Sequence, residues 1–192
     1  MNRVWLDFVM KVRLPIVVAV GAAAFMVTYF VSNAEREGVG YAPEQPIPFS
    51  HKRHAGEMKI DCRYCHIGAD QSRHAVVPSV DTCMNCHSLA RTDSPWIQQL
   101  KKFADEGKPI PWKRVHQVPE FVYFNHSVHV NKGITCQTCH GPVEQMDKIE
   151  QVRPFAMSNC LHCHRNAHEE LQGITDLSQI KKGPENCSAC HR

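Results

Sequence analysis

The stretch FSHKRHAGEMKIDCRYCH, residues 49–66, places two histidines three residues apart ahead of a Cys-x-x-Cys-His motif. Residues 124–140 repeat this order, with Phe124, His126 and His129 leading to another such motif. The two copies begin about 75 residues apart, and a repeat of that length indicates a duplicated structural unit. We therefore expect two related modules that use the same chemistry.

Every cysteine of the chain belongs to a Cys-x-x-Cys-His motif, and the 10 cysteines form five of them. The five motifs are Cys62/Cys65/His66, Cys83/Cys86/His87, Cys136/Cys139/His140, Cys160/Cys163/His164 and Cys187/Cys190/His191. Such a motif attaches haem c through both thiols and supplies the proximal iron ligand from its histidine. Structural zinc or disulfide bonds are the alternatives for a single motif. Five copies without a spare cysteine predict five covalently bound haems.

The histidines outside the motifs are candidates for the distal iron ligands. Two imidazoles three residues apart project from one helical turn, so each His-x-x-His pair is able to clamp two haems. The predicted assignments are His51 to the Cys62/Cys65 haem, His54 to the Cys83/Cys86 haem, His126 to the Cys136/Cys139 haem and His129 to the Cys160/Cys163 haem. We expect His162 and His168 to be ordinary surface residues rather than ligands.

An uncharged stretch of 18 residues near the N-terminus, Leu14 to Val31, is apolar enough to enter a membrane. As a helix it would span about 27 Å of a hydrocarbon core about 30 Å thick. Arg3, Lys11 and Arg13 precede this stretch, so the positive-inside rule places the N-terminus in the cytoplasm.

The alternative for the N-terminus is a cleaved signal peptide, because Ser32-Asn33-Ala34 is an acceptable cleavage site. A core of 18 residues is long for a signal peptide, so we expect a retained single-pass anchor in the inner membrane. Haem c is attached on the outer side of that membrane. The haem domain is therefore expected in the periplasm.

The predicted domains are an anchor at 1–33, a proline-rich linker at 34–48, a dihaem module at 49–90, a connection at 91–122 and a trihaem module at 123–192. In the connection, Ser94 and Pro95 predict a helix start and Gly107 predicts its end. Its apolar stripe is expected to pack against haem or a partner subunit; it consists of Trp96, Ile97, Leu100 and Phe103. With about 29 residues per haem, the predicted fold class is mainly coil with short α-helices.

The doubled Phe-x-His-x-x-His arrangement, each copy followed by Cys-x-x-Cys-His, resembles the small class III cytochromes, cytochrome c3 and triheme c7. The resemblance extends to the pentahaem subunit of alternative complex III, a quinol:electron-acceptor oxidoreductase. It rests on the anchor, the two-plus-three division of motifs, and residues 110–116, 121–126 and 157–160. It implies an iron-sulfur subunit, polytopic quinone-binding subunits and a monohaem cytochrome c as partners in the membrane, with a soluble electron acceptor or an oxidase downstream.

The resemblance also implies a distal ligand for the last haem. Small cytochromes of this pattern carry that ligand where Met157 stands, three residues before Cys160. A thioether ligand at the Cys187/Cys190 haem would raise its potential above those of haems with two histidines. His74 and His116 are the reserves for this position.

The leading functional hypothesis is an electron-transfer subunit without a substrate site of its own, because the histidines outnumber the irons. It would conduct electrons from an iron-sulfur or quinol site to a periplasmic cytochrome c or oxidase. The alternatives are a stand-alone membrane-anchored quinol dehydrogenase, and a reductase of nitrite-like oxyanions with Arg114 and His116 at an open haem. The formal charge of +3 turns negative once haem propionates are counted. No basic docking face is inferred, and no nucleic-acid partner is expected.

Overall fold

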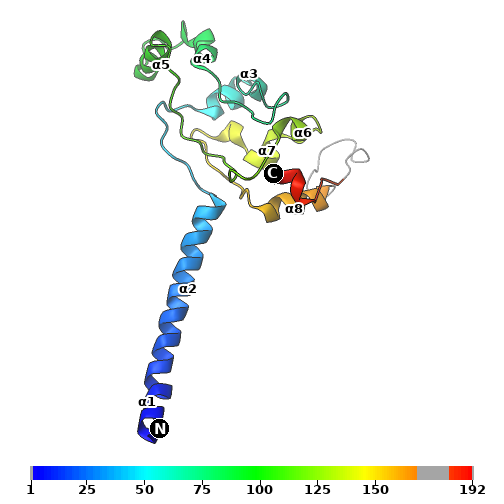
Figure 1. Cartoon of the computed structure of the whole chain (residues 1–192). Helices are drawn as coiled ribbons and strands as arrows, with labels where there is room; N and C mark the ends of the chain where they lie inside the picture. The colour runs from blue at the N-terminus through cyan, green and yellow to red at the C-terminus, as the bar shows by residue number, and fades with distance from the viewer. Residues whose placement is uncertain (1, 168–181, 192) are drawn as a thin grey trace. The chain divides into compact units, whose positions relative to one another are not determined.

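The computed structural model describes residues 2–167 and 182–191 (Figure 1). Internal contacts divide the chain into two units, Met1–Gly38 and Val39–Arg192. Short helices, turns and coil make up the described residues, which contain one long apolar N-terminal helix and no β-strand. The predicted fold class is confirmed.

The N-terminal unit is a continuous helical segment made of α1 (Arg3–Phe8), η1 (Val9–Arg13) and α2 (Leu14–Glu37). The π-helical turns of η1 come just before Pro15, which has no backbone N–H to donate. Among the described residues, Arg3–Val31 is the one helix long and apolar enough to cross a membrane, with a mean hydropathy of 2.2 in its most apolar window. Its apolar side chains are exposed, as both a membrane anchor and a signal sequence require.

Short helices carry the cysteine motifs of the second unit. They are α3 (Cys62–Cys65), α4 (Val80–His87), α7 (Cys136–His140), α8 (Met157–Arg165) and α10 (Cys187–Cys190). The paired histidines lie at the start of η2 (Lys52–Glu57) and on α6 (His126–Val130). None of the predicted ligands lies on α5 (Pro95–Asp105) or η3 (Val143–Gln145). Because the two cysteines of a motif are three residues apart, one helical turn brings both thiols to the same side of the helix.

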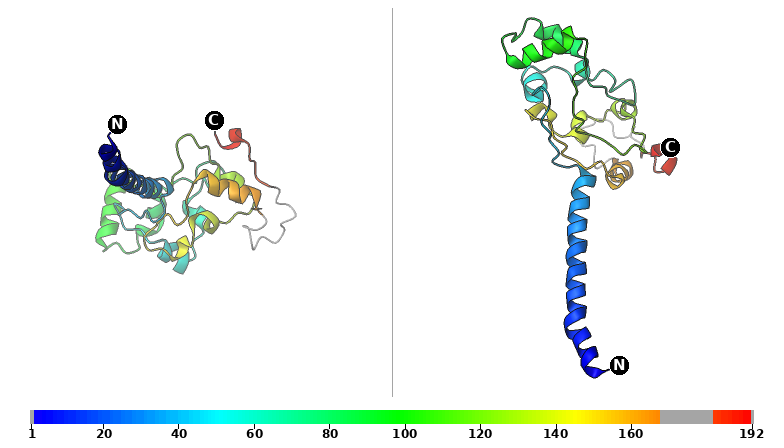
Figure 2. Two further views of the ribbon diagram at one scale, coloured as in Figure 1. Left: turned by 90° about the horizontal axis from the view of Figure 1, so that it is seen from below. Right: turned by 60° about the vertical axis from the view of Figure 1, so that its left-hand side comes forward.

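Main-chain hydrogen bonds join the first half of the second unit to its second half. The Ser127 N–H donates to the carbonyl of Ser72 at 3.0 Å, which ties the loop after α3 to α6. The Lys52 N–H donates to the carbonyl of Met146 at 2.9 Å, which ties η2 to the segment after η3. Figure 2 shows the cyan and yellow segments close together from two directions. The duplicated elements therefore form one interlocked body.

A small protein core lies between α4 and α5. It consists of Ile47, Val80, Leu100 and Ile110, with Ile97, Phe103 and Trp112 packed against it. Most of the apolar stripe of α5 is thus covered by the chain itself. The expected contact for this stripe was haem or a partner subunit. Trp96, by contrast, stays 49% exposed. The sequence could not distinguish these partners, because an apolar stripe shows that a face is covered but not by what.

Replacing Leu100 by alanine is expected to lower the free energy of unfolding by about 3 kcal/mol, because the side chain is only 4% exposed and its removal leaves a cavity. Guanidinium denaturation followed by circular dichroism measures this change. Leu89→Ala is the matched control, since Leu89 is 89% exposed and its loss leaves no cavity. Equal effects of the two substitutions would contradict the assignment of this core.

Candidate haem sites

The ten cysteines all lie among the described residues, and none of them forms a disulfide bond. In α3 the turn that carries them begins at Asp61, whose carboxylate accepts a hydrogen bond from the Arg63 N–H at 2.8 Å. The arginine side chain lies beside the same carboxylate and, as the largest cause, lowers the pKa of Asp61 through its hydrogen bond. The cap fixes the start of the helix, so that both thiols of this motif project from the same helical turn.

Cys86 departs from the pattern of the other motifs. In four motifs the first cysteine is exposed and the second is half-buried, whereas on α4 Cys83 is half-buried and Cys86 is exposed. The cause is the protein core beside α4, because Cys83 packs against it and its partner thiol is left on the outer side. The five identical motifs gave no sign of this difference in exposure. Its thiol still lies near that of Cys65, whose pKa is raised by burial, then by Cys62 and by Cys86.

The structure brings three of the predicted distal histidines to their expected proximal partners. The ring centroids are 6.1 Å apart for His54 and His87, 6.4 Å for His126 and His140, and 6.2 Å for His129 and His164. Imidazole nitrogens bind metals at about 2.0 Å, so two rings on opposite sides of one metal ion have centroids about 6 Å apart. These separations suit axial ligation of a single iron.

Backbone carbonyls orient the imidazoles. In each case the Nδ1–H donates to the carbonyl, which leaves Nε2 free to bind iron. The pairs are His54 with Ser50 (2.8 Å), His66 with Val76 (2.7 Å), His87 with Ala90 (3.1 Å), His126 with Arg73 (2.9 Å), His129 with Asn125 (2.7 Å), His164 with Pro184 (2.7 Å) and His191 with Phe121 (3.3 Å). Sequence reasoning missed these acceptors, because any residue type supplies a carbonyl.

His51 has a different environment from these histidines. Its Nδ1 is buried without a hydrogen-bond partner. Burial, followed by the nearby His66, lowers the pKa of His51 to about 4. Burial, followed by His116, likewise lowers the pKa of His140 to about 4. Both imidazoles are therefore neutral at neutral pH, the form in which histidine binds a metal.

The predicted fifth site lies between α10 and the segment before α6. The Phe121 ring stacks on the His191 ring at a centroid distance of 5.7 Å, and Val122 pairs with His191 in an isolated antiparallel bridge. Met157 begins α8, and its side chain is 63% exposed. Helix α8 also carries Cys160, whose thiol lies near that of Cys190 on α10, so the thioether stands on a helix adjoining this site.

The structure places the reserve ligands elsewhere. The His116 ring lies perpendicular to the His140 ring at 4.4 Å, and its Nε2 is buried without a hydrogen-bond partner. Burial lowers the pKa of His116, and a hydrogen bond with the Glu150 backbone offsets part of this effect. The His74 side chain is exposed. His168 lies outside the described residues, and the exposed ring of His162 is hydrogen-bonded to Asn166 at 3.2 Å.

The backbone of Gly183 packs against the ring of His164, which belongs to the His129/His164 pair. The Gly183 N–H donates to the carbonyl of His164 at 3.0 Å, and the next residue, Pro184, accepts the hydrogen bond from the His164 Nδ1–H. A Cβ added at Gly183 would collide with the His164 ring. The segment before α10 therefore fixes the orientation of a ligand on α8.

Thiols of different motifs lie close enough to affect one another's ionisation. Burial, followed by the neighbouring Cys65, raises the pKa of Cys83. Burial, followed by Cys62, raises the pKa of Cys136, and the side chains of Cys62 and Cys136 are also hydrogen-bonded to each other. The motif on α3 therefore lies between the motifs on α4 and α7.

The second half of the domain continues this row. Burial, followed by Cys163, raises the pKa of Cys139. Burial, followed by Cys190, raises the pKa of Cys160. The spatial order of the motif helices is thus α4, α3, α7, α8 and α10, and Figure 1 shows the first four of them in this succession. It differs from the order along the chain only in the exchange of α3 and α4.

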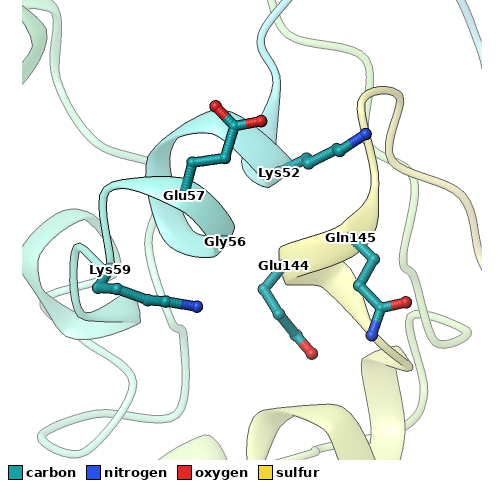
Figure 3. Close-up of a pocket in the computed structure, with 6 residues that line it drawn as sticks. All are labelled: Lys52, Gly56, Glu57, Lys59, Glu144 and Gln145. Atoms are coloured by element: carbon teal, nitrogen blue, oxygen red, sulfur yellow. The ribbon is translucent and has the colours of Figure 1, made fainter.

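A hollow of about 600 Å³ lies between η2 and η3, as Figure 3 shows. It is lined by Lys52, Gly56, Glu57, Lys59, Glu144 and Gln145. A Cβ added at Gly56 would collide with the carbonyl oxygen of Glu144, so only glycine permits the close approach of the two segments. None of the predicted haem ligands lines this hollow.

The arrangement of the candidate residues fits covalently bound haem. Three pairs of imidazoles have ring centroids 6.1 to 6.4 Å apart. Within the described part of the chain, all of these rings except that of His140 have a hydrogen bond from Nδ1 to a backbone carbonyl, and each thiol pair lies on one helical turn. Among the described residues no large side chain is fully buried, as expected where the cofactor forms most of the interior. Two protein families match the chain. Residues 28–108 match the class III cytochrome C family, and residues 122–192 match cytochrome c7 and related cytochrome c.

The chain is a multihaem cytochrome c whose matched regions resemble the class III and c7 cytochromes. Cytochromes of this kind carry covalently bound haem c and transfer electrons. This multihaem cytochrome is also similar to the multiheme cytochrome c subunit of menaquinone reductase from Nitratidesulfovibrio vulgaris, strain Hildenborough. The two are 28% identical over 170 residues, which cover 78% of this chain and 77% of the relative.

Proposed function

We propose that this cytochrome carries five haems and conducts electrons along the row of its motifs. The attachment residues are Cys62, Cys65, Cys83, Cys86, Cys136, Cys139, Cys160, Cys163, Cys187 and Cys190. The proximal ligands are His66, His87, His140, His164 and His191, and the distal ligands are His51, His54, His126, His129 and Met157. The observation that carries the proposal is the approximately 6 Å separation of the histidine pairs at three of the motifs. When bound, haem c supplies a one-electron carrier whose iron cycles between two oxidation states.

The ends of the row are the Cys83/Cys86 motif and the Cys187/Cys190 motif. In this proposal electrons enter at one end and leave at the other, and the protein residues hold each iron six-coordinate. Such coordination leaves no position for a substrate, so the chain has no catalytic residue of its own. A methionine at the Cys187/Cys190 haem would give that end of the row the higher potential, which favours the flow of electrons toward it.

We further propose that the chain belongs to a membrane complex that oxidises quinol. Its N-terminal helix would anchor it in the inner membrane, with the N-terminus in the cytoplasm and the haem domain in the periplasm. Its partners would be an iron-sulfur subunit, polytopic quinone-binding subunits and a monohaem cytochrome c. The acceptor would be a periplasmic cytochrome or an oxidase. The resemblance to alternative complex III supports this assignment.

The second candidate function is the opposite direction of flow, from a periplasmic electron donor to quinone. The relative from Nitratidesulfovibrio vulgaris is described as a subunit of a menaquinone reductase, and this name favours the second candidate. The row of motifs is compatible with either direction. In a row of six-coordinate haems, only the reduction potentials decide which way electrons move.

Stopped-flow absorbance of the purified complex distinguishes the two candidates. Mixing the oxidised complex with menaquinol is expected to reduce its haems within the turnover time, and adding oxidised periplasmic cytochrome c is expected to reoxidise them. The second candidate would be supported if quinol does not reduce the haems, whereas a reduced cytochrome reduces them and quinone oxidises them. Failure of both quinol and quinone to exchange electrons with the haems would overturn both.

A further inference from the structure

Arg73 lies in the loop after α3, at the junction of the two halves of the haem domain. Its backbone carbonyl accepts hydrogen bonds from the His126 N–H at 3.3 Å and from the His126 Nδ1–H at 2.9 Å. The main chain of Arg73 therefore orients the predicted distal ligand of the Cys136/Cys139 haem. This role engages the carbonyl and leaves the side chain available for another contact.

The guanidinium of Arg73 is held beside a second haem motif. Its Cζ lies 4.6 Å from the centroid of the Tyr123 ring, which is a cation–π distance. The Tyr123 N–H in turn donates to the carbonyl of Cys190 at 2.8 Å. The positive charge thus stands between the His126 ligand site and the Cys187/Cys190 motif.

The Nε of Arg73 is buried without a hydrogen-bond partner. Leaving a buried donor unpaired is destabilising, and more so when the donor belongs to a charged group. Among the described residues no carboxylate forms an ion pair with Arg73. The guanidinium is therefore suited to an anionic acceptor that the described part of the chain does not provide.

We propose that Arg73 binds a propionate of the haem attached at Cys136/Cys139 or of the haem attached at Cys187/Cys190. Carboxylates are the preferred partners of arginine, because the planar guanidinium offers parallel N–H groups at matching spacing. The Tyr123 ring supports the guanidinium on one face and restricts its rotation. Arg73 would anchor the cofactor at the junction of the two halves and, as a fixed positive charge, would raise the potential of the haem that it binds.

Redox titrations of the intact complex, followed by optical and EPR spectroscopy, test the proposal with three variants. Arg73→Gln is expected to lower the midpoint potential of one haem and leave the others unchanged. Arg73→Lys keeps the charge but loses the Nε donor, so it should lower the same potential by a smaller amount. Arg91→Gln removes an exposed arginine beside α4 and should not move that potential.

A background that carries His126→Met identifies the haem concerned, because methionine ligation marks the Cys136/Cys139 haem by a raised potential. If Arg73→Gln fails to assemble, Arg73→Lys decides the question. Potentials of Arg73→Lys identical to those of the wild type would overturn the proposal, since Nε would then have no acceptor to lose.

The inference rests on the proposed attachment of haem at these two motifs. Haem quantitation on the wild-type complex separates the two failures. Fewer than five haems would overturn the proposed function. Five haems whose potentials are all insensitive to Arg73 would overturn only the role of this residue.

Discussion

Replacing Cys136 and Cys139 by serine is expected to remove one haem and to interrupt electron flow through the complex almost completely. The motif on α7 lies in the middle of the row, because its thiols adjoin Cys62 on one side and Cys163 on the other. Its loss would leave two separate pairs of haems. Electron tunnelling falls steeply with distance, so a missing central carrier is not replaced by its neighbours.

Stopped-flow reduction by quinol measures this effect. The expected trace has a fast phase for the haems on the donor side of the gap, while those beyond it stay oxidised. Cys187→Ser with Cys190→Ser is the matched control, since it also removes one haem but from the end of the row. That variant should keep its four remaining haems in rapid exchange. Equal slowing in both variants would contradict the linear order.

Replacing His129 by alanine is expected to convert one haem from six-coordinate low-spin to five-coordinate high-spin. The His129 ring faces the His164 ring at 6.2 Å, and its Nδ1–H is held by the carbonyl of Asn125 at 2.7 Å. Burial lowers the pKa of His129, which keeps the imidazole neutral and able to bind iron. Alanine leaves no donor atom at this position.

Low-temperature EPR and carbon monoxide binding measure the conversion. One haem equivalent should acquire a high-spin signal and bind carbon monoxide. His74→Ala is the matched control, because this exposed histidine should ligate nothing. A high-spin haem in His74→Ala would mean that the reserve ligand is used after all, and its absence in His129→Ala would show that another group completes the coordination.

The proximity of three of the five predicted ligand pairs could be predicted from sequence, because the spacing within each His-x-x-His pair is a matter of local geometry. Residues three apart on one turn project together, and a short connection leads from each pair to its first motif. His126 and His129 lie on α6 as this spacing requires, and their rings reach His140 and His164. Two short stretches of sequence thus contain most of the information on the candidate ligands.

The spatial order of the motifs could not be predicted, because it depends on contacts between distant segments. The approach of Cys62 to Cys136 joins residues more than 70 positions apart, and no local pattern records it. The exposure of Cys86 was missed for the same reason, since the core that holds Cys83 includes Leu100 of the following helix.

The propionate-binding role proposed for Arg73 also depends on a distant contact, because its neighbour Tyr123 belongs to the other half of the domain. Helix α2 continues to Glu37, past residue 33, where the anchor is expected to end; this boundary of the anchor stays a prediction.

Low-temperature EPR of the fully oxidised complex tests the central claim, that this chain holds five closed haems as an electron conductor. The account predicts five low-spin ferric signals from this subunit, one of them with histidine/methionine character, and no change when nitrite or cyanide is added. A high-spin signal in the wild-type protein that shifts with either anion would contradict it, because an open iron would then be available to a substrate.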